Sequence, residues 1–153
     1  QIALLANIAV ETGNSFDHKQ QQRGSSAPAK GLLQFDPSGK LNDYKKYLDL
    51  NSYIDSAQNQ INYFMDTIYG DSKKEIGHGN AAKLRDIIET GDYKQVTQAL
   101  TDMWFKPGKP HMERRMDEAY GFALQDQNET NRRTRELSQQ PVDLNKTGFE
   151  PTI

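Results

Sequence analysis

Glu11 is the residue whose type and position most directly suggest chemistry. It follows Leu4 and Ile8 at helical spacing, on the apolar face of a helical pattern over residues 1–11. A carboxyl group on such a face is partly withdrawn from water, which favours its protonated form. A protonated carboxyl group beside a substrate is a general acid, as glycoside hydrolysis requires. The alternative is a glutamate at a helix end that points to solvent or caps a loop.

A short segment further along the chain is the best candidate for a strand. It contains Gly31, Leu32, Gln34 and Phe35, and residues 36–39 follow it as a turn. The glycine would let the backbone approach a sugar closely, and the glutamine amide would both donate and accept hydrogen bonds. The alternative is an ordinary edge strand with one polar side chain.

Glycoside hydrolysis usually needs a second carboxylate, and two residues are candidates. Asp36 could face Glu11 as nucleophile or stabiliser, but a turn-forming role ahead of Pro37 is an equal alternative. Asp17 could cap or orient the loop after the first helix. If neither faces the substrate, the enzyme is an inverting hydrolase with a distant base, or a lytic transglycosylase that needs one acid. His18 is close enough in sequence to line the same cleft, although a surface position is the alternative.

Several other chemistries are excluded by composition and spacing. The chain has no cysteine, so disulfides, cysteine nucleophiles and Cys-bound zinc are absent. Its three histidines lack metal-binding spacing, and we expect no metal and no cofactor. A net charge of −2 is not the footprint of a nucleic-acid-binding protein, and no apolar run would cross a bilayer. Residues 1–10 lack the features of a signal peptide, and the missing initiator Met suggests a piece of a longer protein.

The elements that must position these residues are mainly helices. The fold class is therefore α+β, mainly α, with one strand segment after the first helix. A polar stretch at 125–140 and a sparse one at 141–153 suggest a linker or an arm that docks on another subunit, separate from a domain over residues 1–124. The periodicity predicts helices over residues 1–11, 41–50, 52–69, 81–89, 92–105 and 112–124.

Four motifs, in the same order, resemble those of phage tail lysozyme domains. Residues 7–13 resemble the GN-x-x-x-E-S/T-G helix end, and residues 29–35 resemble the Y-G-L-x-Q-W strand. Residues 52–63 resemble the following segment with a glutamine and an aromatic residue. Residues 104–119 are similar to the F-x-x-x-W/Y-E-R-P…R…A ending. The resemblance covers residues 1–124.

The resemblance implies a lysozyme-like fold, with a short β-hairpin or strand beside the catalytic helix. It implies a virion-associated muramidase that cleaves the β-1,4 MurNAc–GlcNAc bond of peptidoglycan and opens the cell wall during infection. Carried over by position, Glu11 is the catalytic acid and residues 31–35 line the cleft. The implied partners are glycan strands and other virion or tail proteins, with no nucleic acid and no membrane; the oligomeric state stays open.

Other functions stay open beside this one. They are a lytic transglycosylase with the same acid, a non-catalytic virion structural or glycan-binding module, and a helical adaptor that docks through residues 125–153. The chain also departs from the family pattern. Phe35 stands where tryptophan is common, which keeps stacking on a sugar but loses an indole donor. Phe105-Lys106-Pro107 replaces E-R-P, so an ion pair is lost or moved.

Overall fold

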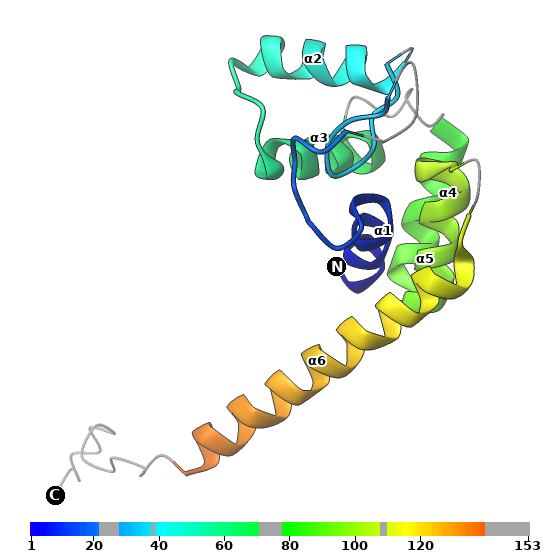
Figure 1. The fold of residues 1–153 in the computed structure, drawn as a ribbon. Helices are drawn as coiled ribbons and strands as arrows, with labels where there is room; N and C mark the ends of the chain where they lie inside the picture. The colour runs from blue at the N-terminus through cyan, green and yellow to red at the C-terminus, as the bar shows by residue number, and fades with distance from the viewer. Residues whose placement is uncertain (22–27, 38, 71–77, 108–109, 140–153) are drawn as a thin grey trace, which may run out of the picture.

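The computed structural model describes residues 1–21, 28–37, 39–70, 78–107 and 110–139, and this part of the chain is mainly helical (Figure 1). In chain order its elements are α1 (Ile2–Thr12), α2 (Lys40–Asn51), α3 (Ala57–Tyr69), α4 (His78–Glu89), α5 (Tyr93–Leu100), the π-helix η2 (Thr101–Phe105) and α6 (Met112–Ser138).

Helix α1 is the central element of the fold, and it packs against α5 and α6 (Figure 1). The small side chains of Ala3, Ala6 and Ala9 are buried on it, which lets neighbouring helices approach closely. The helix ends as predicted at Gly13, which adopts the left-handed conformation with φ of 59°. Helix α4 packs against both α3 and α5, and α2 packs against α3.

An aromatic cluster joins α2, α3 and η2 to the segment that follows α1. The ring of Phe35 stacks on Tyr44 at a centroid distance of 4.6 Å and meets Tyr63 edge-on at 5.7 Å. Trp104 lies 6.2 Å from Phe35 and donates from its indole nitrogen to Thr67 Oγ1 at 3.0 Å. These rings are almost fully buried, so the core includes the very segment that was predicted to bind sugar.

The predicted strand at residues 31–35 is a tight loop, and the described residues contain no β-hairpin of the expected kind. Lys30 and Phe35 form a single antiparallel bridge, in which each backbone N–H donates to the carbonyl of the other residue. Two left-handed residues, Gly31 (φ 80°) and Gln34 (φ 47°), curl the chain between them. The hydrophobic run at Leu32 and Leu33 therefore enters the core from a turn, without strand alternation.

The predicted helices are found, with shifted boundaries. Helix α3 begins at Ala57, and not at residue 52, because Ser52 is left-handed (φ 55°) and Ser56 caps the helix by accepting from the backbone of Asn59. Asp92 caps α5 in the same way. The predicted helix over residues 92–105 changes at Thr101 into a π-helix.

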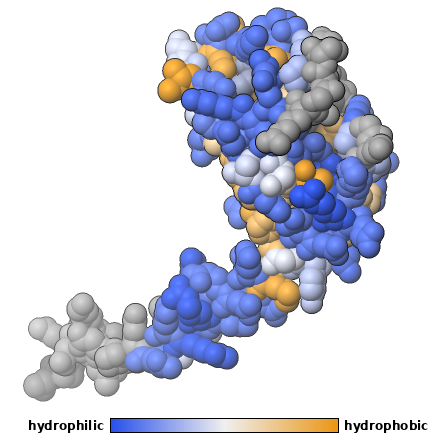
Figure 2. Space-filling model, viewed as in Figure 1, coloured by the Kyte–Doolittle hydropathy of each residue, from blue (hydrophilic) through white to orange (hydrophobic). Residues whose placement is uncertain are grey.

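The last helix is longer than predicted, because the polar segment after residue 124 continues α6 to Ser138. This half projects away from the body and shows hydrophilic surface (Figures 1 and 2). Glu129 pairs with Arg132 and Arg133 one turn later, and Arg132 also pairs with Glu136. Pairs at this spacing favour a helix, and the guanidinium groups lower the pKa of Glu129 to about 2. The predicted extended part at 141–153 lies outside the described residues.

The described helices include none that combines the length and apolarity of a membrane span.

Candidate active site

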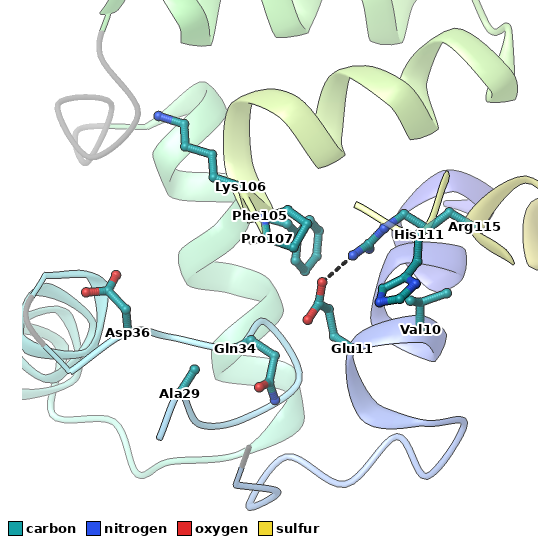
Figure 3. A pocket seen from close by; sticks show the side chains of 10 residues that line it. All are labelled: Val10, Glu11, Ala29, Gln34, Asp36, Phe105, Lys106, Pro107, His111 and Arg115. Atoms are coloured by element: carbon teal, nitrogen blue, oxygen red, sulfur yellow. Dashed lines mark hydrogen bonds and ion pairs between the residues drawn. The ribbon is translucent and has the colours of Figure 1, made fainter. Parts of the chain in front are cut away.

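Glu11 lies in the last turn of α1, and its side chain is 17% exposed at the wall of a pocket of about 720 Å³ (Figure 3). The pocket is formed where α1, the loop at residues 30–35, η2 and the start of α6 meet. The other residues that line it are Val10, Ala29, Gln34, Asp36, Phe105, Lys106, Pro107, His111 and Arg115.

A second hollow of about 810 Å³ also borders Glu11. It is bordered by residues of the segment after α1, among them Gly13, Asp17 and Lys19. Glu11 and Gln34 line both hollows. Glu11 and Gln34 therefore lie where the two hollows adjoin, and the two hollows together are called the groove below.

The carboxyl group of Glu11 is held by a buried cation. Arg115, on α6, is 1% exposed and donates from Nη2 to Glu11 Oε1. Its Nη1 donates to Asn7 Oδ1 at 2.7 Å and its Nε donates to the Pro110 carbonyl at 2.6 Å. The Phe105 ring centroid lies 5.8 Å from the guanidinium carbon. All three nitrogen positions of Arg115 therefore have acceptors, as a buried guanidinium requires.

Asn7 explains why α1, η2 and α6 meet at this point. It precedes Glu11 by one helical turn and is fully buried. Its Oδ1 accepts from Arg115 and from Thr101 Oγ1 at 2.9 Å, while its Nδ2 donates to the Ala3 carbonyl at 2.8 Å. Asn7 and Glu11 thus present one polar edge of α1 to Arg115.

The ion pair with Arg115 is a contact of Glu11 that the sequence did not suggest. One oxygen of Glu11 is occupied by Arg115, and the other points into the pocket on the side of Gln34 (Figure 3). The second oxygen is therefore the one that faces the space in which a ligand would lie.

The loop facing Glu11 is held from beneath by Gln60, a buried residue of α3. Its Oε1 accepts from the backbone N–H of Leu32 at 2.8 Å. Its Nε2 donates to the His18 carbonyl at 2.8 Å and to Asp55 Oδ1 at 2.9 Å. A Cβ at Gly31 would lie 2.5 Å from Gln60 Oε1, so this approach requires glycine.

The π-helix η2 supplies the opposite wall of the pocket. Its closing bond runs from the backbone N–H of Lys106 to the Thr101 carbonyl at 2.8 Å. The wider turn places Phe105, Lys106 and Pro107 at the pocket, whereas Trp104 lies in the core. Such single π-turns are frequent at functional sites.

The structure brings Glu11, Gln34 and Asp36 to the same pocket, but the two acids do not face each other. The side chain of Asp36 points away from Glu11 (Figure 3). Its Oδ2 accepts from the backbone of Lys40 at 3.4 Å, at the start of α2. Asp17 lines the second hollow, and its Oδ1 accepts from the backbone of Lys19 at 2.9 Å. Both aspartates thus take part in local turns.

Other residues predicted to contact substrate lie elsewhere. Leu32 and Phe35 are 5% and 1% exposed and belong to the core, which corrects the expectation that the Phe35 ring would stack on a sugar. The backbone N–H groups of Gly31, Leu32, Gln34 and Phe35 donate within the protein and so are not available to a sugar. His18 lines a third, smaller pocket and borders neither hollow beside Glu11.

Gln60 and the Arg115 contact with Glu11 are features that the sequence analysis did not assign. No cluster of three or more potential metal ligands occurs among the described residues.

A family model described as phage tail lysozyme matches residues 2–123. No curated protein and no solved structure matches the chain significantly.

Replacing Gly31 by Ala tests how the loop is held. Both the positive φ and the contact with Gln60 oppose the new Cβ, so we expect the free energy of unfolding to fall by about 3 kcal/mol. Gly91→Ala is the matched control, since Gly91 has φ of 72° but no neighbour within 4 Å. It should lose only about 1 kcal/mol. Urea unfolding followed by the fluorescence of Trp104 measures both, and equal losses would contradict the role of Gln60.

Arg115→Lys tests the buried network while keeping the charge. A lysine cannot bond Glu11, Asn7 and Pro110 together, so we expect a loss of about 2–3 kcal/mol in the same unfolding measurement. The control is Arg114→Lys, at an exposed position next to it, which should change stability by less than about 0.5 kcal/mol. Similar values for the two variants would show that the network does not stabilise the fold.

Proposed function

The chain belongs to the phage tail lysozyme family, and from this premise we propose that it cleaves the glycan strands of bacterial peptidoglycan with Glu11 as general acid. The bond is the β-1,4 linkage between MurNAc and GlcNAc. The observation that carries the proposal is the position of Glu11: a mostly buried side chain that borders two adjoining hollows. A polymer must extend past the acid in both directions when an internal bond is cut.

In this mechanism Glu11 transfers its proton to the glycosidic oxygen as the bond to the sugar carbon breaks. Arg115 holds Oε1, so the proton leaves from the oxygen that points into the pocket. The guanidinium then stabilises the carboxylate that remains, because its charge is already in place before the reaction. The side-chain amide of Gln34 binds hydroxyl or acetamido groups where the two hollows meet.

We further propose that the protein acts in a phage particle, at the cell wall of the host, and is mounted through its C-terminal part. The projecting half of α6 supports this, since it leaves the body as a continuous helix (Figure 1) that is rich in charged residues. Other tail proteins are the partners that this role requires.

Glu11→Gln is the direct test of the proposed acid. Glutamine keeps an oxygen that accepts from Arg115, so the fold should survive while the transferable proton is lost. We expect clearing of purified cell walls to fall by about 10³-fold. Glu89→Gln, which removes an exposed acid at the end of α4, should retain full activity. Clearing at the wild-type rate by a folded Glu11→Gln protein would remove the general-acid claim.

A lytic transglycosylase is the second candidate, and the orientation of Asp36 favours it. Because Asp36 points away from Glu11 and bonds the start of α2, a second carboxylate facing the scissile bond is not provided there. A transglycosylase needs one acid/base only, because a hydroxyl group of the substrate attacks the sugar carbon. A muramidase uses water and leaves reducing ends, whereas a transglycosylase leaves 1,6-anhydro-muramic ends.

Asp36→Asn and product analysis separate these routes. We expect the variant to keep activity within about fivefold, because an amide oxygen can still accept from the backbone of Lys40. A loss of about 10²-fold or more would assign Asp36 to the reaction and favour hydrolysis. Mass spectrometry of the products of the wild-type protein identifies reducing or anhydro ends and so distinguishes the two enzymes.

A further inference from the structure

A small basic pocket of about 240 Å³ lies behind the loop that faces Glu11. Three lysines converge on it from separate segments: Lys19 from the stretch after α1, Lys30 from the start of the loop, and Lys45 from α2. His18 and Gly31 complete this part of the wall. Three like charges around one small space create a positive potential, although the whole chain has a net charge of −2.

These lysines lack the ion pairs that would neutralise them. Among the described residues, no carboxylate lies within ion-pair distance of Lys19, Lys30 or Lys45. All three residues are exposed at the pocket rim, so their ammonium groups are accessible to a ligand. An anion that enters the pocket would therefore meet three available donors.

Asp55, the one carboxylate in the described lining, is already satisfied by neutral donors. Its Oδ1 accepts from the Tyr44 hydroxyl at 2.9 Å and from Gln60 Nε2 at 2.9 Å. Burial raises the pKa of Tyr44 above its usual range, so its hydroxyl stays protonated as a donor. These bonds connect the floor of the pocket to the buried core and leave the lysines on the rim.

The basic pocket adjoins the second hollow beside Glu11. Lys19 borders both the second hollow and the basic pocket, and Gln60 anchors the loop between them. A glycan bound next to Glu11 would therefore hold any group attached to its sugars close to the lysines. In peptidoglycan the lactyl group of each MurNAc carries a short peptide with free carboxylates.

We propose that the pocket at Lys19, Lys30 and Lys45 binds a carboxylate of the peptide stem on a MurNAc unit in the groove. The inference rests on the proposed function, and it makes the enzyme selective for peptide-bearing glycan. The stem is covalently tied to the bound sugar, so its effective concentration at the pocket is high and exposed charges suffice for selection. Phosphate groups of other wall polymers share the anionic chemistry but lack this tether.

The double variant Lys30→Gln/Lys45→Gln tests this pocket and leaves both hollows beside Glu11 intact. On intact peptidoglycan we expect kcat/KM to fall by about fivefold, as for the loss of two exposed charge contacts. On glycan strands freed of stems by an amidase, the variant and the wild type should cleave equally. High salt should reduce the preference of the wild type for intact strands, because it screens the lysines.

Lys83→Gln/Lys94→Gln is the matched control, since it removes two exposed lysines on α4 and α5 and gives the same net charge. It should behave as the wild type on both substrates. An equal fall in kcat/KM for both double variants would show that overall charge explains the effect, and it would overturn the proposed role of the pocket. A fall of the same size on stripped strands would overturn it as well. If the wild type cleaves neither substrate, the proposed function fails.

Binding is measured separately from cleavage, so that the two failures are distinguishable. A stem tetrapeptide is titrated into ¹⁵N-labelled Glu11→Gln protein, and amide shifts are followed by NMR. We expect shifts at Lys30, Gly31 and Lys45 that disappear in the background of Lys30→Gln/Lys45→Gln. No shift at millimolar peptide would overturn the inference even for an active enzyme. A stronger response to glycerol phosphate than to the peptide would assign the pocket to phosphate polymers and overturn it too.

Discussion

A buried cation is the constraint around which this protein is organised. Arg115 is 1% exposed, and a guanidinium taken out of water is tolerated only when its N–H donors are matched by acceptors. Glu11 and Asn7 on α1 and the Pro110 carbonyl ahead of α6 provide that match. The contacts that stabilise the buried guanidinium therefore also hold the last turn of α1 against α6. The carboxyl group at the pocket is placed by the packing of the fold itself.

The loop opposite Glu11 is likewise held by one buried side chain. Gln60 satisfies the Leu32 amide, the His18 carbonyl and Asp55 with one buried side chain. The loop is thus tied to α3, to the segment after α1 and to the start of the basic pocket. Its hydrophobic residues join the aromatic core, and only Gln34 of this loop lines the two hollows beside Glu11. The rigidity of the groove depends on core packing more than on strand pairing.

The helices, the position of Glu11 near the end of α1, and the family were predictable, because helical periodicity, the Gly13 cap and ordered motifs are local signals. The loop was predicted wrongly, since a hydrophobic run flanked by turn residues does not reveal left-handed φ values at Gly31 and Gln34. The Glu11–Arg115 contact joins residues 104 positions apart, which no local pattern contains. One signal was present: Arg115 lies on the apolar stripe of Met112 and Ala119, where a charge needs a partner.

The arrangement of the spaces suits a polymer better than a small molecule. A site for a small ligand is usually one enclosed cavity, whereas here three open hollows adjoin through shared walls. Glu11 and Gln34 are common to the first two, and Lys19 is common to the second and third. Glu11 therefore borders the first two hollows, and the lysines border the third. A glycan strand carries an acidic peptide on every second sugar, so the lysines would also favour one of the two directions in which the strand can lie beside Glu11.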